Sequence, residues 1–151
     1  MEKWIARLET LLHRYKSGDY RVLKDGEALI KAVPKKIKAF FYVSLVNFAL
    51  LANEIEKAQK YIEKAYQYHK EDEFLDIINL IGTGALVHFY KGELTEVLEI
   101  IEDSGIKDDF FIQFRKAECL YWLGRFEQAK EEYQKASRLC ENDNTLQEEI
   151  E

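Results

Sequence analysis

The sequence of 151 residues has little proline, cysteine or glycine: one Pro, two Cys and seven Gly. With Pro34 as the single proline, long helices can run without interruption, because proline inside a helix removes a hydrogen bond and clashes with the preceding turn. Turn pairs such as Asn-Gly are absent, and no alternating apolar segment outlasts a helical pattern, so the signals of β-hairpins are missing. These absences favour an all-α protein.

Long apolar runs and an excess of basic residues are missing too. No run reaches the ~18 apolar residues that a membrane-spanning helix needs. The net charge is -6, whereas a basic surface is the usual mark of proteins that bind nucleic acid. The first four residues, Met1 to Trp4, already include two charged side chains and do not resemble a secretory signal. We therefore expect a cytoplasmic protein with no nucleic-acid or membrane partner.

The two cysteines, Cys119 and Cys140, are expected to be free thiols. In the last helical pair predicted below, their levels along the helix axes differ by roughly 15 Å at ~1.5 Å per residue. A disulfide needs Cα atoms within about 7 Å of each other. The spacing therefore argues against a bridge.

A faint repeat divides the chain at four positions between apolar segments, namely Gly18, Asn53, Gly92 and Gly124. These positions are 35, 39 and 32 residues apart, spacings typical of stacked helical hairpins. Gly and Asn are the residues that best tolerate the left-handed backbone at helix ends. We predict that each of them lies between two antiparallel helices.

The repeat predicts four helical pairs in a single domain, 1–151. The units span residues 2–33, 36–70, 74–105 and 107–140, followed by a short C-terminal cap or tail, 141–151. The predicted helices span residues 2–16, 19–32, 36–52, 55–69, 74–91, 94–103, 107–123 and 126–140. The longer spacing before the third unit predicts a longer linker near 70–73. The helix 36–52 is apolar on more than one face, which predicts burial nearly all round.

Two charged runs, residues 35–38 and Glu131-Glu132, are interpreted as solvent-exposed faces. Three lysines at a helix start oppose the helix macrodipole, so we expect the acidic ends of a neighbouring pair, or an acidic partner, to compensate them. Lys outnumbers Arg 16 to 6, and a surface rich in Lys and Glu points to a thermophilic source.

The fourth unit resembles a tetratricopeptide repeat, a family in which a small residue, an aromatic residue and two alanines recur at fixed offsets. The matching residues are Tyr121, Gly124, Phe126, Ala129, Tyr133 and Ala136. Gln113 and Glu141 replace the early Trp and the closing Pro of the family pattern. A weaker resemblance covers residues 36–140, with a degenerate copy in 2–33. It implies a right-handed superhelix of about four antiparallel helix hairpins, an α-α solenoid.

The resemblance implies a non-enzymatic scaffold that binds a partner protein or peptide in a concave groove. The residues at groove-facing offsets are largely aromatic, with a few polar groups: Phe40, Val43, Asn47, Leu50, Asn79, Leu86, Phe89, Tyr90, Phe111, Phe114, Arg115, Glu118, Tyr121 and Trp122. Such a surface suits an amphipathic helix or an extended apolar peptide, with Asn47 and Arg115 fixing the register. For any one of these aromatic residues, the alternative is that it belongs to the core. A clamp for a C-terminal carboxylate, found in some members, is disfavoured because Val43 and Phe111 replace its lysines.

Two rival functions stay open: a small chaperone that dimerises, and a structural subunit that self-associates. A homodimer would also cover the apolar end of the last unit.

No cofactor, metal or catalytic residue is predicted, because His13, His69 and His88 fall in different pairs without other ligands at metal-binding spacing. The segment 82–84, Gly-Thr-Gly, lacks the Lys of a phosphate-binding loop, and close helix packing explains it better.

Overall fold

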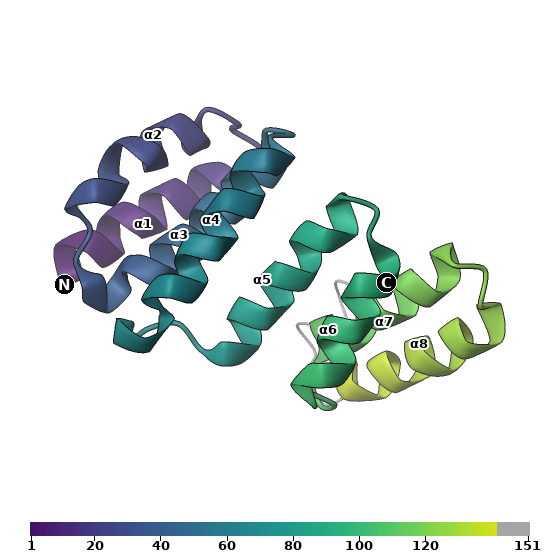
Figure 1. Ribbon diagram of the computed structural model, residues 1–151. Helices are drawn as coiled ribbons and strands as arrows, with labels where there is room; N and C mark the ends of the chain where they lie inside the picture. Colours follow the sequence, from purple (N-terminus) through teal and green to yellow (C-terminus); the bar gives the residue numbers. More distant parts are fainter. Residues whose placement is uncertain (142–151) are drawn as a thin grey trace. The chain divides into compact units, whose positions relative to one another are not determined.

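The computed structural model describes residues 1–141, which contain eight α-helices, two short 3-10 helices and no strand (Figure 1). This confirms the predicted all-α class. The predicted tail, 141–151, lies outside the described residues except for Glu141. The chain divides into two compact units, Met1–Tyr90 and Lys91–Glu151, and each is described by itself. The single domain and the right-handed superhelix stay predictions.

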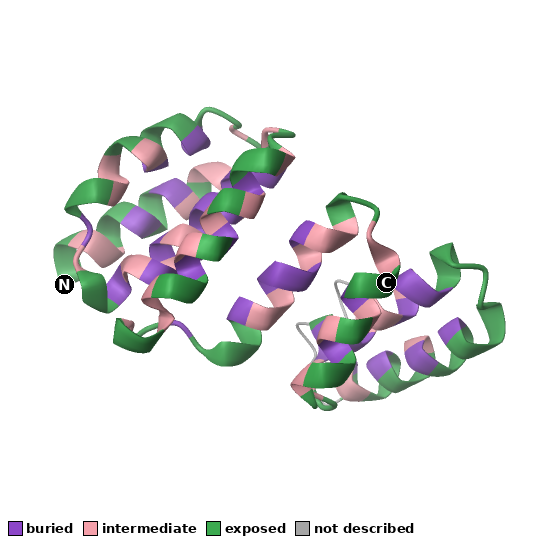
Figure 2. Cartoon of the chain, viewed as in Figure 1, coloured by how far each residue is buried: buried purple, intermediate pink, exposed green. Residues whose placement is uncertain are grey.

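The first unit has α3 at its centre. Its helices are α1 (Glu2–Lys16), α2 (Val22–Leu29), α3 (Lys35–Leu51), α4 (Ile55–Tyr68) and α5 (Ile77–Tyr90), with 3-10 helices at Ile30–Ala32 and His69–Glu71. Helix α3 contacts all four other α-helices of the unit. Phe41, Leu45 and Phe48 on α3 are fully buried, which confirms the predicted burial of this helix (Figure 2).

Two glycines allow helices of the first unit to pack closely. A Cβ atom at Gly26 on α2 would lie 2.7 Å from Leu45 Cδ2 and 3.4 Å from the ring of Phe48. A Cβ atom at Gly84 on α5 would lie 2.9 Å from the hydroxyl of Tyr66 on α4. Helix α4 therefore lies close to Gly84, in agreement with the helix-packing interpretation of the Gly-Thr-Gly segment.

The second unit contains α6 (Leu94–Ser104), α7 (Phe110–Trp122) and α8 (Phe126–Cys140). Helix α7 contacts α6 and packs extensively against α8. A left-handed glycine, Gly105 with φ 68°, ends α6. The sequence repeat did not predict this turn, because Gly105 lies between predicted pairs rather than within one.

The four predicted turn residues all have the left-handed backbone. The φ angles of Gly18, Asn53, Gly92 and Gly124 are 82°, 57°, 78° and 80°. Asn53 is the only non-glycine residue with positive φ among residues 1–141. The anchor positions of the repeat are thereby confirmed.

The carboxylate of Asp72 holds the linker before α5 against α3. Asp72 Oδ2 accepts a hydrogen bond from Phe40 N at 2.9 Å, and Asp72 Oδ1 accepts from Phe74 N at 2.7 Å. Helix α5 begins at Ile77 rather than at the predicted residue 74, because Asp76 Oδ1 accepts the bond from Asn79 N at 2.7 Å and so ends the linker.

Two other predicted helices are shorter in the structure. The predicted helix 19–32 is α2 followed by a 3-10 turn that ends before Pro34. The predicted helix 107–123 begins at Phe110, because the carboxylate of Asp109 caps it and accepts from Ile112 N at 2.9 Å. Caps of this kind supply partners to backbone N–H groups that have none inside the helix.

The lysines at the start of α3 are compensated within the first unit. Lys35 Nζ lies 3.9 Å from Glu71 Oε2, and Lys36 Nζ lies 3.7 Å from Glu73 Oε1. Both carboxylates belong to the segment that follows α4, the partner of α3 in the same pair, and not to the neighbouring pair that was expected to supply them. The charge of this run is thus balanced by the chain itself.

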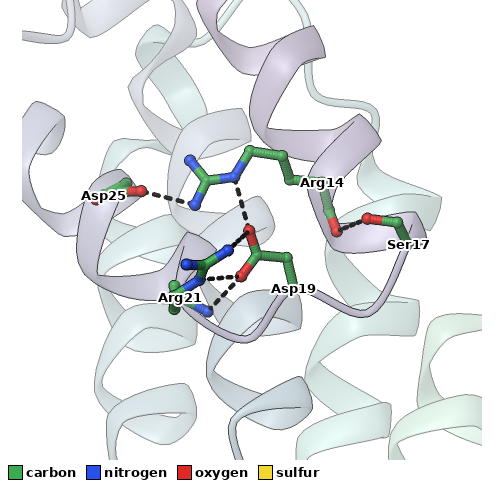
Figure 3. Close-up of polar contacts among 5 residues, drawn as sticks. All are labelled: Arg14, Ser17, Asp19, Arg21 and Asp25. Atoms are coloured by element: carbon green, nitrogen blue, oxygen red, sulfur yellow. Dashed lines mark hydrogen bonds and ion pairs between the residues drawn. The ribbon is translucent and has the colours of Figure 1, made fainter.

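An ionic network fixes the turn between α1 and α2 (Figure 3). Asp19 accepts hydrogen bonds from Arg21 Nε at 2.9 Å and from Arg14 Nε at 3.0 Å, and Arg14 Nη2 also reaches Asp25 at 2.7 Å. The side-chain bond from Arg21, joined by that from Arg14, lowers the pKa of Asp19 to about 2. The network stabilises the turn that begins with Gly18.

Candidate functional site

Small side chains let α7 and α8 approach each other in the second unit. Ala129, Ala136 and Cys140 form one buried stripe on α8, and Ala117 and Cys119 are buried on α7. Methyl and thiol groups permit a close approach of helix backbones, and the aromatic residues fill the space beside them. Phe110 is buried beside these small residues, whereas Phe111, Trp122 and Phe126 remain exposed.

A buried polar pair joins the same two helices. Gln113 on α7 and Glu132 on α8 are 7% and 8% exposed, and Gln113 Nε2 donates a hydrogen bond to Glu132. Lys135 and Lys116 lie 3.2 and 3.6 Å from Glu132 Oε1. The interpretation of Glu132 as solvent-exposed is therefore wrong. The pair also gives a structural role to Gln113, where the family pattern has Trp.

One face of α7 exposes large apolar side chains. Phe111 and Trp122 are 56% and 67% exposed. They lie on the same face because the positions 111, 115, 118 and 122 recur at helical spacing. Eleven residues separate the two rings by roughly 16 Å along the axis, at ~1.5 Å per residue. Between them, Arg115 Nη1 pairs with Glu118 Oε1 at 2.6 Å. The face thus has an apolar side chain at each end and a charged pair between them.

A shallow pocket lies beside this face, between the end of α7 and the length of α8. It has a volume of about 460 Å³ and is lined by Tyr121, Phe126, Ala129, Lys130, Tyr133, Gln134 and Ser137. The ring of Tyr121 packs edge-on against Phe126, with centroids 5.5 Å apart. Phe126, one of the residues that carry the resemblance to a tetratricopeptide repeat, is nevertheless 60% exposed.

The predicted groove residues of the second unit fall on these surfaces. Phe111, Tyr121 and Trp122 are exposed, and Phe114, Arg115 and Glu118 are partly exposed. The prediction omitted Phe126, Lys130 and Tyr133, which line the pocket. Phe126 and Tyr133 recur at helical spacing with Ala129 and Ala136, which favours core packing, and Lys130 belongs to the polar face. No signal in the sequence distinguishes Phe126 and Tyr133 from the core positions of α8.

The predicted groove residues of the first unit have mixed environments. Val43 and Leu50 are 4% and 9% exposed and belong to the core. Phe40, Asn47, Leu86 and Phe89 are partly buried, and Asn79 and Tyr90 are exposed. Asn47 Nδ2 donates to the carbonyl of Val43 at 3.2 Å. A continuous groove that includes these residues stays a prediction.

The thiols offer little chemistry. Cys119 and Cys140 are both buried and form no disulfide with each other, as the sequence predicts. Burial raises the pKa of Cys119 to about 11, so its thiolate, the reactive form, is scarce at neutral pH.

Within residues 1–141, no three His, Cys, Asp or Glu side chains are grouped closely enough to hold a metal ion. In the same residues, no helix has both the length and the apolar character to cross a membrane.

A comparison with known families matches the part of the chain that contains α7 and α8. The tetratricopeptide repeat family model matches residues 110–143, a segment that begins where α7 begins. A comparison with curated proteins found no match. Tetratricopeptide repeats generally mediate protein–protein interactions and are typically parts of non-enzymatic scaffolds. The last helical pair of the chain is thus similar to a tetratricopeptide repeat, as its sequence pattern predicts.

Proposed function

We propose that this protein is a non-enzymatic binding module that captures an amphipathic helix of a partner protein on the exposed face of α7. The observation that carries the proposal is the exposure of Phe111 and Trp122 on one face of a helix whose opposite face is core. Large aromatic side chains that stay exposed are costly in water and dominate the binding energy of many interfaces.

The geometry of the face suggests the form of the partner. The roughly 16 Å between the two rings corresponds to about three turns of a partner helix. Such a helix would place one apolar side chain against Phe111 and another against Trp122. Arg115 and Glu118 would meet polar side chains between these two anchors and fix the register. The predicted role of Arg115 is retained here, and Asn47 and the aromatic residues of the first unit remain proposed extensions of the surface.

The test is a selection of displayed helical peptides of about 20 residues against the whole chain. We expect the wild-type protein to enrich amphipathic peptides with two apolar anchors, and the Phe111→Ala/Trp122→Ala variant to enrich none of them. Tyr20→Ala is the matched control, because Tyr20 is as exposed as Trp122, at 67%, but lies outside the proposed surface. Equal enrichment by the wild-type protein and the double variant would refute the proposal.

The rival functions have a separate readout. A dimerising chaperone or a self-associating subunit would show a concentration-dependent mass in sedimentation. The binding module proposed here has a mass of one chain, 17.9 kDa, across micromolar concentrations. A stable dimer that dissociates when Trp122 is replaced would assign this face to self-association instead.

A further inference from the structure

Exposed aromatic rings connect the proposed binding face of α7 to the pocket between α7 and α8. The ring of Tyr121 packs edge-on against Trp122 on the face and against Phe126 in the pocket, with centroids 5.5 Å apart in both pairs. These three side chains are between 48% and 67% exposed. Apolar surface therefore continues from Trp122 into the pocket.

The pocket has an apolar wall and no carboxylate in its lining. Its volume of about 460 Å³ lies within the ~300–1,000 Å³ of pockets that accept small ligands, and Phe126, Ala129 and Tyr133 contribute apolar surface to it. Two other pockets of the chain differ in this respect. The one at the start of α4 is lined by two glutamates, and the one formed by residues of α6, α7 and α8 is lined by four. In a chain with 28 acidic residues, a pocket without carboxylates can accept an acidic ligand.

The single charged residue of the lining is Lys130. The other two lysines of α7 and α8 both pair with Glu132, at 3.6 and 3.2 Å. Within residues 1–141, Lys130 forms no ion pair with another side chain. Lys130 is also exposed, so its charge is available to a carboxylate of a partner.

We propose that this pocket is a specificity subsite of the proposed function, which takes an aliphatic side chain of the partner helix and pairs Lys130 with a neighbouring carboxylate. The partner is thereby an acidic amphipathic helix, in which a Leu or Ile and an Asp or Glu lie three or four positions apart and project to the same side. A helix of 20 residues spans ~30 Å, so it can cover the roughly 16 Å between Phe111 and Trp122 and continue to the pocket. This inference rests on the proposed function.

The experiment extends the selection of displayed 20-residue helical peptides to two charge variants of the whole chain. We expect the wild-type protein to enrich Asp or Glu three or four positions from an aliphatic residue beyond the two anchors, and Lys130→Glu to enrich Lys or Arg there instead. Arg138→Glu is the matched control, because it changes the net charge by the same amount on the same helix, but Arg138 does not line the pocket. It should enrich the same acidic peptides as the wild-type protein.

A double-mutant cycle then measures the pairing with one synthetic peptide from the wild-type selection. Lys130→Gln should weaken binding about threefold, as expected for an exposed ion pair, and should have no effect on a peptide whose acidic residue is replaced by Gln. The loss should shrink at ~0.5 M salt, where charges are screened. Phe126→Ala should weaken binding about fivefold, but not when Ala replaces the aliphatic residue of the peptide. Both side chains are exposed, so circular dichroism should show both variants folded like the wild-type protein.

The outcomes separate this subsite from the proposed function. Peptides that require Phe111 and Trp122 but show no acidic preference, or a preference that Lys130→Glu does not reverse, would overturn the subsite and leave the proposed function intact. A wild-type selection that enriches no amphipathic peptide would overturn both.

Discussion

Helices α3 and α7 have the same position in the sequence repeat, but their corresponding faces have different surroundings. Counting from the turns at Asn53 and Gly124, Leu50 corresponds to Tyr121. Leu50 is 9% exposed, whereas Tyr121 is 48% exposed. Within its unit α3 contacts four other α-helices, and α7 contacts two. The comparison teaches that the number of neighbouring helices decides which apolar side chains of a repeat remain exposed and available to a partner.

The largest expected effect contrasts an aromatic residue from each helix. Phe48 is fully buried on α3 and packs against Tyr15, with ring centroids 5.6 Å apart. Phe48→Ala should lower the free energy of unfolding by ~3–5 kcal/mol, as for other buried Phe residues. Trp122→Ala, on the exposed face of α7, should change it by no more than ~0.5 kcal/mol. Urea denaturation of both variants measures the difference, and a loss above 2 kcal/mol for Trp122→Ala, roughly the cost of a core truncation, would show that its ring is structural.

A second prediction concerns the polar pair that replaces apolar packing in the second unit. Glu132→Ala should cost ~1–3 kcal/mol of stability, because the buried amide of Gln113 loses its acceptor. The double variant Gln113→Leu/Glu132→Leu should recover part of this loss, because neither partner is then left unsatisfied. Thermal and urea denaturation of both variants provide the measurement. A double variant less stable than Glu132→Ala would contradict this account of the pair.

The sequence predicted most where a single residue type has a strong local preference. Gly18, Asn53, Gly92 and Gly124 could be identified because few residues tolerate positive φ. Helix ends set by side-chain capping were predicted less well. Asp76 decides where α5 begins, but Asp and Glu are so frequent in this chain that no single carboxylate could be identified as the cap.

The candidate site could be predicted only in part, because side-chain exposure depends on neighbouring helices. Val43 and Phe114 have equivalent positions in the repeat, but Val43 is buried and Phe114 is partly exposed. The sequence pattern marks both positions as apolar and cannot distinguish them. Glu132 was misassigned for the same reason, since its burial follows from Gln113, which is 19 positions away in the chain.

The two glycines of the first unit provide a finer comparison of packing. Gly26→Ala should be destabilising by ~1–2 kcal/mol, because the overpacking against buried Leu45 outweighs the gain in helix propensity. Gly84→Ala should stabilise by up to ~1 kcal/mol, because its neighbour is the terminal hydroxyl of Tyr66, a side chain that is 48% exposed and can move. Denaturation midpoints measured for both variants test this order. The reverse order would mean that Tyr66 is held rigidly.

The smallest effect should come from the turn between α1 and α2. The folded pKa of Asp19 is about 2, below its ordinary value of 3.8, so its ionised form is favoured in the folded state. Its contribution to stability is therefore present above pH ~4 and is lost as the pH falls through ~2. Asp19→Asn should lower the melting temperature at pH 6 and have a much smaller effect at pH 2, where Asp19 is about half protonated in the folded state. Melting curves from pH 2 to 7 measure this, and a constant difference over that range would contradict the assignment.

The most direct test of the proposed binding face is a titration that uses Trp122 as the reporter. Trp4→Phe leaves Trp122 as the only tryptophan, and a peptide selected against the whole chain is added while its emission is recorded. We predict a blue shift on binding, a dissociation constant unchanged by Tyr20→Ala, and at least a tenfold weaker affinity with Phe111→Ala, equivalent to about 1.4 kcal/mol. Binding that leaves the emission of Trp122 unchanged and tolerates Phe111→Ala would place the partner elsewhere and contradict the account.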